Sequence, residues 1–395
     1  MTFDPESVRK DFPVLRAGGL VYFDNACMAL RPATVVDALV AYHSEYPACG
    51  DRSLHRLGRR VDEEVALSRE AARRLLHARR CEEIVFIPNT TYGINLVAHS
   101  FPFVPGDVVV GSDQEHNSNL LPWLALARHG VRHRAVPFGD LDALRAALTP
   151  EVKLVAMVMT SNLDGASIDA GAVIDLAHRC GIPVLLDAAQ AVPHRPVDVR
   201  ALDVDFLACS GHKMLGPSGT GILYGKGEWL ARLRPTLVGG GTVVDSTLEG
   251  ATYLGAPECF EAGLQNYGGI AGLRPAIEYL ERIGHAAIAE HERRLTQALD
   301  AGIRRIAGVS VLGPSPDRRG GITSFTLAGA DVHQVCMLLD QSAGIAVRSG
   351  QHCVHSWFAR RAVAGTVRAS LYLYNTLGEV QTFCESLDSV RRVLA

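Results

Sequence analysis

Six short apolar segments, separated by stretches of helical character, lie between residues 84 and 225 and constrain the fold of this chain more than any other feature. The segments are IVFI (84–87), DVVVG (107–111), KLVAMVM (153–159), IPVLLD (182–187), VDFLAC (204–209) and GILYG (221–225). Strands that are apolar on both faces are typical of a mostly parallel sheet with helices on each side. The pattern therefore predicts an α/β fold built on such a sheet.

The C-terminal third of the chain has a different pattern. Residues 269–301 have long helical periodicity, and the later segments VSVLG, GITSFTL, AVRSG and TVRASLYLY are typical of strands with helices among them. This change predicts a second, smaller α+β unit. The expected domains are an N-terminal segment 1–20 that packs with the small domain, a large domain 21–280 and a small domain 281–395.

Composition and charge exclude several classes of protein. A chain of 395 residues with a net charge of −3 gives no sign of nucleic-acid binding, and no apolar run reaches the length of a membrane span. The opening MTFDPESVRKDF is charged, so no secretory signal is expected. Nine scattered cysteines without a C-x-x-C pair indicate reduced thiols, and we expect a cytoplasmic location.

Polar side chains follow the predicted strands at their carboxyl ends, where open α/β sheets bind ligands. In chain order these residues are Thr90, Thr91, His116, Asn162, Asp187, Gln190, Ser210, His212 and Lys213. Each one alone has an ordinary interpretation as a helix cap or loop residue. Together, five strand ends offer phosphate donors, an aromatic ring, a carboxylate and an amine at one edge.

Pyridoxal phosphate requires this combination of groups. It needs a lysine for its covalent bond to the protein, a carboxylate that keeps the pyridine nitrogen protonated, and donors for the phosphate. Lys213 and Asp187 supply the first two, and the threonine pair before a predicted helix supplies donors for the third. We therefore expect pyridoxal phosphate as the cofactor.

Competing motifs are weaker. GPSGTG follows Lys213, whereas a phosphate-binding P-loop places its lysine after the glycines, and GGG (239–241) lacks the strand and helix of a dinucleotide site. His352, Cys353 and His355 form H-C-x-H, which is not a standard zinc spacing and has no second ligand pair nearby. The stretch RSGQHCVHSWF (348–358) leaves three interpretations open: a zinc ligand, a core thiol or a nucleophile.

Motifs across most of the chain resemble the class V aminotransferase-like enzymes of fold type I, and within them the second group of cysteine desulfurases and the selenocysteine lyases. The lysine segment SGHKMLGPSGTGILY (210–224) carries the resemblance to the superfamily. RSGQHC (348–353), with R-A-S starting at Arg368, carries the narrower one. Further matching segments are YFDNACMALRP (22–32), NTTYGINLVA (89–98), EHNSNLLPW (115–123), SNLDG (161–165), LLDAAQAVPHRPVDV (185–199) and FEAGLQNYGG (260–269). The resemblance implies a seven-stranded-type large sheet.

The resemblance also implies a role for each site residue. Lys213 would bind the cofactor covalently, Asp187 would pair with its pyridinium nitrogen and His116 would stack on its ring. Asn162 and Arg368 would bind the substrate carboxylate, and Cys353 would accept sulfur. The remaining cofactor contacts are those of Gln190 with the phenolic oxygen and of Thr90, Thr91, Ser210 and His212 with the phosphate. No metal ligand is expected.

The implied reaction converts L-cysteine to L-alanine and leaves a persulfide on Cys353, with a separate acceptor protein for the sulfur. Only a thiolate is a good nucleophile, and His352, His355 or Arg368 could favour that form of Cys353. Cys27 lies in a family motif near the expected site and is the other thiol of interest.

The family is usually a homodimer, and we expect the same of this chain. Leu264 and Gln265 stand where the family has Thr-Pro after F-E-A-G, and that threonine reaches the phosphate of the other subunit's cofactor. The contact between subunits is therefore expected to differ at this point.

Other functions remain open from the sequence. Selenocysteine lyase activity would depend less on Cys353. A C–S lyase, epimerase or aminotransferase would make Cys353 incidental. A non-enzymatic regulator that binds the cofactor would need an output module, which the sequence does not indicate.

Overall fold

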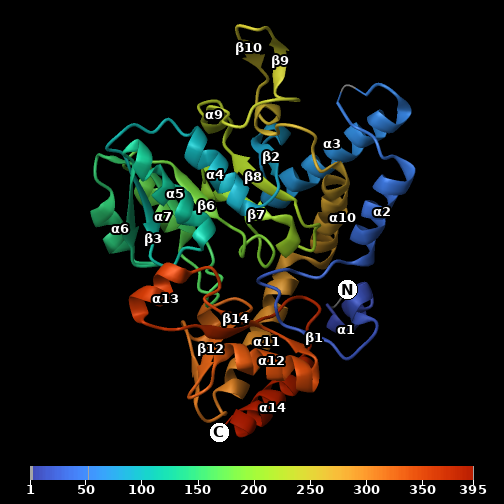
Figure 1. The fold of residues 1–395 in the computed structure, drawn as a ribbon, viewed down its shortest axis with the longest axis vertical. Helices are drawn as coiled ribbons and strands as arrows, with labels where there is room; N and C mark the ends of the chain where they lie inside the picture. The colour runs from blue at the N-terminus through green and yellow to red at the C-terminus, as the bar shows by residue number, and fades with distance from the viewer. Residues whose placement is uncertain (1–2, 52, 395) are drawn as a thin grey trace.

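A computed structural model describes residues 3–51 and 53–394 of the chain (Figure 1). The predicted boundaries at 1–20, 21–280 and 281–395 extend over residues 1–2, 52 and 395, which lie outside the described ranges. Those boundaries stay a prediction. The structure contains a large sheet and a smaller one, stacked along the long axis of the molecule (Figure 1).

The large sheet has seven strands and is mostly parallel, as predicted. Its spatial order is β2 (Ile84–Ile87), β8 (Gly221–Gly225), β7 (Phe206–Ser210), β6 (Val184–Asp187), β5 (Val152–Val158), β3 (Val108–Ser112) and β4 (Arg132–Val136). Only β8 runs against its two neighbours. Because β2 and β7 are both antiparallel to β8, they run in the same direction, together with β6, β5, β3 and β4.

Helices cover both faces of this sheet because alternate strand residues point to opposite sides. Val85 and Ile87 pack into a core with α4 (Thr90–Ser100) and α5 (Leu121–Ala125). Ile84 and Phe86 pack into a larger core on the other face. The helices of that second core are α3 (Arg56–Leu76), α6 (Leu141–Ala147), α7 (Ala170–His178) and α10 (Tyr267–Ile283), joined by α2 (Ala33–Glu45) and the one-turn α8 (Val199–Leu202).

The sequence pattern does not indicate strand β4. Its residues RHRAV are mostly polar and four of the five are at least partly accessible, because β4 is the edge strand and pairs only with β3. An edge strand needs less apolar surface than a central one, so the apolar run that predicts the other strands is absent here.

The smaller sheet is antiparallel. Its order is β11 (Val309–Val311), β12 (Ile322–Leu327), β15 (Thr366–Ser370) and β14 (Arg348–Gly350). Three helices share a buried core with it: α11 (His285–Ile303), α12 (Val332–Ala343) and α14 (Leu377–Leu394). Shorter helices elsewhere are α1 (Pro5–Arg9), α9 (Gly227–Leu230) and α13 (His355–Arg361).

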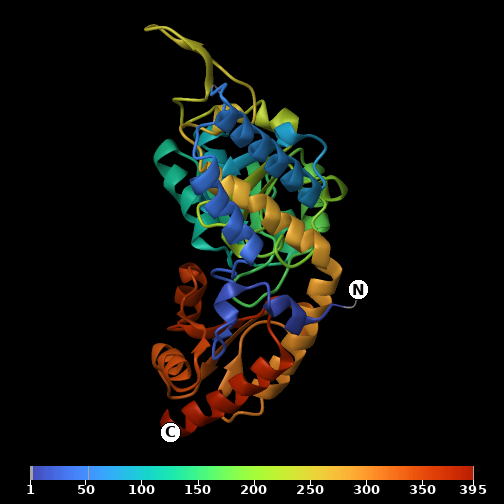
Figure 2. The same ribbon diagram turned by 90° about the vertical axis from the view of Figure 1, so that its right-hand side faces the viewer.

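Helices and strands both connect the part of the molecule around the large sheet to the part around the small sheet. Helix α10 ends beside the large sheet and α11 begins after Gly284, whose φ of 86° is a left-handed conformation that suits glycine. The two helices run one after the other from the large part to the small one (Figure 2). In addition, β1 (Val21–Tyr22) pairs in parallel with β13 (Ile345–Ala346), so the N-terminal segment lies against the C-terminal part.

A β-hairpin projects from the end of the molecule opposite the small sheet (Figure 1). It consists of β9 (Val243–Ser246) and β10 (Ala251–Tyr253). Its tip residue Leu248 is fully exposed. Among the described residues, no helix has the length and apolar character needed to cross a membrane.

Candidate active site

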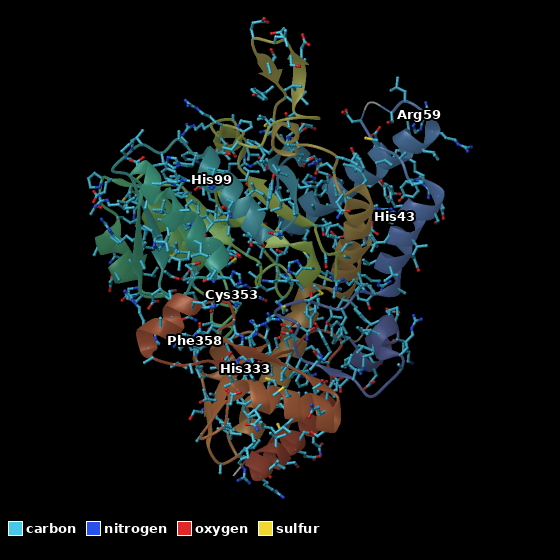
Figure 3. All side chains as sticks on the ribbon, viewed as in Figure 1. His43, Arg59, His99, His333, Cys353 and Phe358 are labelled. Atoms are coloured by element: carbon cyan, nitrogen blue, oxygen red, sulfur yellow. The ribbon has the colours of Figure 1, made fainter. Side chains whose placement is uncertain are left out.

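The carboxyl ends of the parallel strands surround a cavity of about 300 Å³. The small part closes its other side, and Cys353 lies between the two sheets (Figure 3). The structure brings together every site residue that the sequence suggested, from the start of α4 to β15 of the small sheet. The eleven that line the cavity are Thr90, Thr91, His116, Asn162, Asp187, Gln190, Ser210, His212, Lys213, Cys353 and Arg368.

One end of the cavity is formed by the N-terminus of α4. Asn89 caps this helix by accepting a hydrogen bond from the Tyr92 backbone N–H at 3.0 Å. The hydroxyls of Thr90 and Ser210 are 2.6 Å apart, and the Thr90 backbone N–H donates to Ser210 Oγ at 2.9 Å. N–H groups at a helix start, together with hydroxyls, form a favourable place for a phosphate.

Asp187 is buried and Lys213 is half-buried in the wall of the cavity. Burial lowers the pKa of Lys213, and the negative charge of Asp187 opposes this effect. Burial likewise raises the pKa of Asp187, opposed by Lys213 and by the Ala189 backbone N–H, which donates to Asp187 Oδ1 at 3.0 Å. Each charge is therefore costly alone and is stabilised by the other.

His116 is held as a neutral ring. The Ser118 backbone N–H donates to His116 Nδ1 at 3.0 Å, so Nδ1 carries no proton and the neutral ring has its proton on Nε2. Burial lowers the pKa of His116 to about 3, and the positive charges of Lys213 and Arg368 add to the effect. At neutral pH this side chain is an uncharged, flat surface on the cavity wall.

Arg368 reaches the cavity from β15 of the small sheet. Its Nη1 donates to the Asn162 carbonyl at 3.0 Å, and its Nη2 lies 3.5 Å from Asp24 Oδ1. Asp24 Oδ2 also lies 3.6 Å from Nη1 of Arg348. One carboxylate thus faces two guanidinium groups, so positive charge remains in the cavity for an anionic ligand.

The loop that carries Cys353 has an unusual backbone. His352 and Cys353 have φ values of 49° and 59°, the left-handed region that residues with a Cβ rarely adopt. The Cys353 carbonyl accepts from the Asn117 backbone N–H at 2.7 Å, and the His352 carbonyl accepts from Asn162 Nδ2 at 2.7 Å. These bonds hold the strained turn so that the Cys353 side chain is exposed at the cavity.

The sequence suggests His352 as a source of positive charge for Cys353, and this expectation is wrong at neutral pH. Burial lowers the pKa of His352 to about 3, and its Nε2 lies 2.8 Å from Thr366 Oγ1. His355 pairs through Nδ1 with Asn117 Nδ2 at 2.9 Å. The two rings have separate partners, and in the described part of the chain no group of three His, Cys, Asp or Glu side chains is arranged to hold a metal ion.

Several residues of the site were not predicted. Ser118 Oγ lies 2.6 Å from the Thr91 hydroxyl, and the Ser118 backbone orients His116, while Asp24 positions both arginines. Asp24 lies in a matching segment, and Ser118 is two residues after His116, but no spacing rule identifies either contact. Their roles arise from pairing between segments far apart in the sequence.

The sequence of this chain is similar to those of known proteins over most of its length. The family model for aminotransferase class V matches residues 21–383. A cysteine desulfurase from Klebsiella pneumoniae is 39% identical, with all of both chains covered. A cysteine desulfurase from Synechococcus elongatus is also 39% identical over 98% of this chain, but this chain spans only 64% of that protein's length.

The fold of this chain is also similar to that of a solved structure. The apo structure of a cysteine desulfurase from Thermococcus onnurineus has a TM-score of 0.95 and 36% sequence identity, with 100% of both chains covered. The similarity therefore includes both the large sheet and the small one.

The depressed pKa of His116 predicts a pH dependence of stability. The unfolded chain takes up this proton near pH 6.5, whereas the folded chain takes it up only near pH 3, so stability falls as pH falls through this window. At pH 5 the loss attributable to His116 is about 2 kcal/mol. Thermal unfolding of His116→Gln is expected to change less between pH 7.5 and pH 5 than that of the unaltered protein. An equal change in thermal stability between these two pH values in both proteins would contradict the lowered pKa of His116.

Proposed function

Because the chain belongs to the aminotransferase class V family, whose enzymes use pyridoxal phosphate, we propose that it is a cysteine desulfurase with Cys353 as the sulfur-accepting nucleophile. The observation that carries the proposal is the presence of Lys213 and Cys353 in one cavity, together with Arg368. The substrate would be L-cysteine and the products L-alanine and a persulfide.

The cavity fits the cofactor. Four of its lining residues have a buried polar atom without a partner in the described part of the chain: Asn162 Oδ1, Gln190 Oε1, His352 Nδ1 and Arg368 Nε. Buried polar atoms normally have hydrogen-bond partners, so these atoms point to a polar molecule that belongs in the cavity. The groups that would hold the cofactor are the α4 N-terminus, Ser210 and His212 for the phosphate, Asp187 for the ring nitrogen and Lys213 for the aldehyde carbon.

Arg368 and Asn162 would bind the carboxylate of the substrate. Arg368 is held in place by the Asn162 carbonyl and by Asp24, so its remaining donors are directed by contacts that already exist. A guanidinium with a fixed orientation recognises a carboxylate through two parallel hydrogen bonds. This would orient the substrate side chain relative to Cys353.

Lys213 would then move the proton from the substrate Cα. Its lowered pKa favours the neutral amine, which is the form that accepts a proton. When bound, pyridoxal phosphate withdraws electrons from the substrate carbon atoms and so makes both the loss of this proton and the breaking of the C–S bond possible. Asp187 would keep the ring nitrogen protonated, and neutral His116 would cover the ring without adding charge.

Cys353 would receive the sulfur as its thiolate. The thiolate attacks the substrate sulfur, an S–S bond forms, and the electron pair of the breaking C–S bond remains with the carbon skeleton, which is released as alanine after protonation. The strained, exposed turn presents the Cys353 side chain to the cavity and to solvent. That exposure would also allow a separate acceptor protein to collect the sulfur.

We further propose a homodimer. Apolar side chains are exposed around the hairpin end of the large part, among them Leu237, Val244, Leu248 and Leu264, with Leu264 77% exposed. Exposed apolar groups gathered in one region are typical of a contact surface. Gln265 folds back on its own loop, with Nε2 donating to the Glu261 carbonyl at 2.7 Å. Sedimentation equilibrium is expected to give twice the mass of one chain; a single-chain mass would contradict the dimer.

A cytoplasmic location belongs to the same proposal. All nine cysteines lie in the described part of the chain and are unpaired. Free thiols fit a reducing compartment.

Lys213→Ala is expected to lose the absorption band of the covalently bound cofactor near the edge of the visible range, because no other amine lines the cavity in the described part of the chain. Spectra of the purified protein and the variant, both supplied with pyridoxal phosphate, measure this. An unchanged band in the variant would show that another group binds the cofactor.

Cys353→Ala is expected to lose at least about 100-fold in alanine formation from L-cysteine, because the thiol that takes sulfur directly from the substrate is missing. Single-turnover reactions with peptide mass mapping would locate the persulfide, and Cys180→Ala, which removes another exposed thiol, is the matched control. Full alanine formation in Cys353→Ala would favour a C–S lyase or another reaction in which Cys353 is incidental.

A further inference from the structure

The cavity contains a second thiol, Cys27, which the mechanism above does not use. Cys27 and Cys353 both line the cavity, and none of the other seven cysteines of the described chain does so. Cys27 is half-buried, on the side of the cavity formed by residues 24–29, while Cys353 is exposed at the opening.

The segment around Cys27 is held by hydrogen bonds on both sides. The Ala26 backbone N–H donates to Ser370 Oγ at 2.9 Å, and the Ala26 carbonyl accepts from Gln190 Nε2 at 2.7 Å. The Ala29 backbone N–H donates to the His212 carbonyl at 2.9 Å. These bonds tie the segment to both parts of the molecule and fix the backbone that carries the Cys27 sulfur.

Arg348 connects the two thiols. Its Nη1 donates to Cys27 Sγ at 3.0 Å, and it stands five residues before Cys353 at the start of β14. Burial opposes the charge of Arg348, yet its pKa is raised, because its interactions with Cys27, Asp24 and Cys353 outweigh the effect of burial. One guanidinium therefore interacts with both thiols of the cavity.

Thiols packed elsewhere in the described chain have a different environment. Burial raises the pKa of Cys209 and of Cys336 to about 12, and those of Cys259 and Cys384 to about 11. These cysteines are packing residues that resist ionisation. Cys27 differs in its position, because it lines the cavity and its sulfur accepts a hydrogen bond from Arg348.

We propose that Cys27 is a second sulfur-accepting thiol that takes the outer sulfur from the Cys353 persulfide. The inference rests on the proposed desulfurase function. The Cys27 thiolate attacks the outer sulfur, a new S–S bond forms at Cys27, and the bond between Cys353 Sγ and that sulfur breaks. Its electron pair stays on Cys353 as a thiolate, and the outer proton moves with the sulfur. The exchange involves no net oxidation or reduction, so it needs no added oxidant.

The transfer would free Cys353 for a second turnover. In the absence of a sulfur acceptor or reductant, the unaltered protein is expected to form two alanine molecules per chain in its rapid phase. Cys27→Ser keeps the approximate size of the side chain but removes the thiol, so it is expected to form one. The predicted change is a twofold loss of burst amplitude.

Rapid quench of the holoenzyme with L-cysteine, followed by alkylation and peptide mass mapping, tests this directly. The expected result is persulfide on both Cys27 and Cys353 in the unaltered protein, and on Cys353 alone in Cys27→Ser. Cys81→Ser is the matched control, because Cys81 is also half-buried but lies outside the cavity. The cofactor absorption band shows whether each variant retains its site.

Persulfide on Cys353 without any on Cys27 would overturn the relay and leave the proposed function intact. No alanine and no persulfide on either thiol would overturn both. A disulfide between Cys27 and Cys353 would also overturn the relay, because attack at the inner sulfur releases sulfide instead of passing the sulfur on.

Discussion

The common direction of the parallel strands in the large sheet is the constraint on which the rest of this structure depends. β2, β3, β5, β6 and β7 run parallel, so their carboxyl ends meet at one edge of the large sheet. Residues that lie 120 positions apart, Thr90 and Ser210, become hydrogen-bonded neighbours at this edge. The strand β8 preserves the arrangement because it is antiparallel to both β2 and β7.

Burial then determines the charge of each group in the cavity. It favours neutral His116, and it opposes charge on both Lys213 and Asp187. Positive charge nevertheless remains at Arg368, where Asp24 provides a partner from the N-terminal segment. The cavity is therefore neutral on the wall formed by His116 and cationic at Arg368, where an anionic substrate would bind.

Much of the site follows from sequence because polar residues directly after apolar strands have a defined place in a parallel sheet. Lys213 and Asp187 are examples, and the segment RSGQHC identifies Cys353 through its resemblance to known enzymes. Contacts between segments that are far apart in the chain cannot be predicted from the sequence in this way. Strand β4 lacks an apolar run, His352 is neutral because of its surroundings, and the bond from Arg348 to Cys27 joins residues 321 positions apart.

The parallel pairing of β1 with β13 affects the order in which segments of the chain can fold during synthesis. Residues 84–225 can assemble the large sheet once they leave the ribosome, but Val21 must wait for Ile345, and the Ala26 backbone must wait for Ser370. Residues 21–26 are thus synthesised before the large sheet but can dock only after it has formed. A chain cut short before β15 would carry all seven strands of the large sheet, but it would lack Arg368 in the cavity and the Ser370 contact of the segment that bears Cys27.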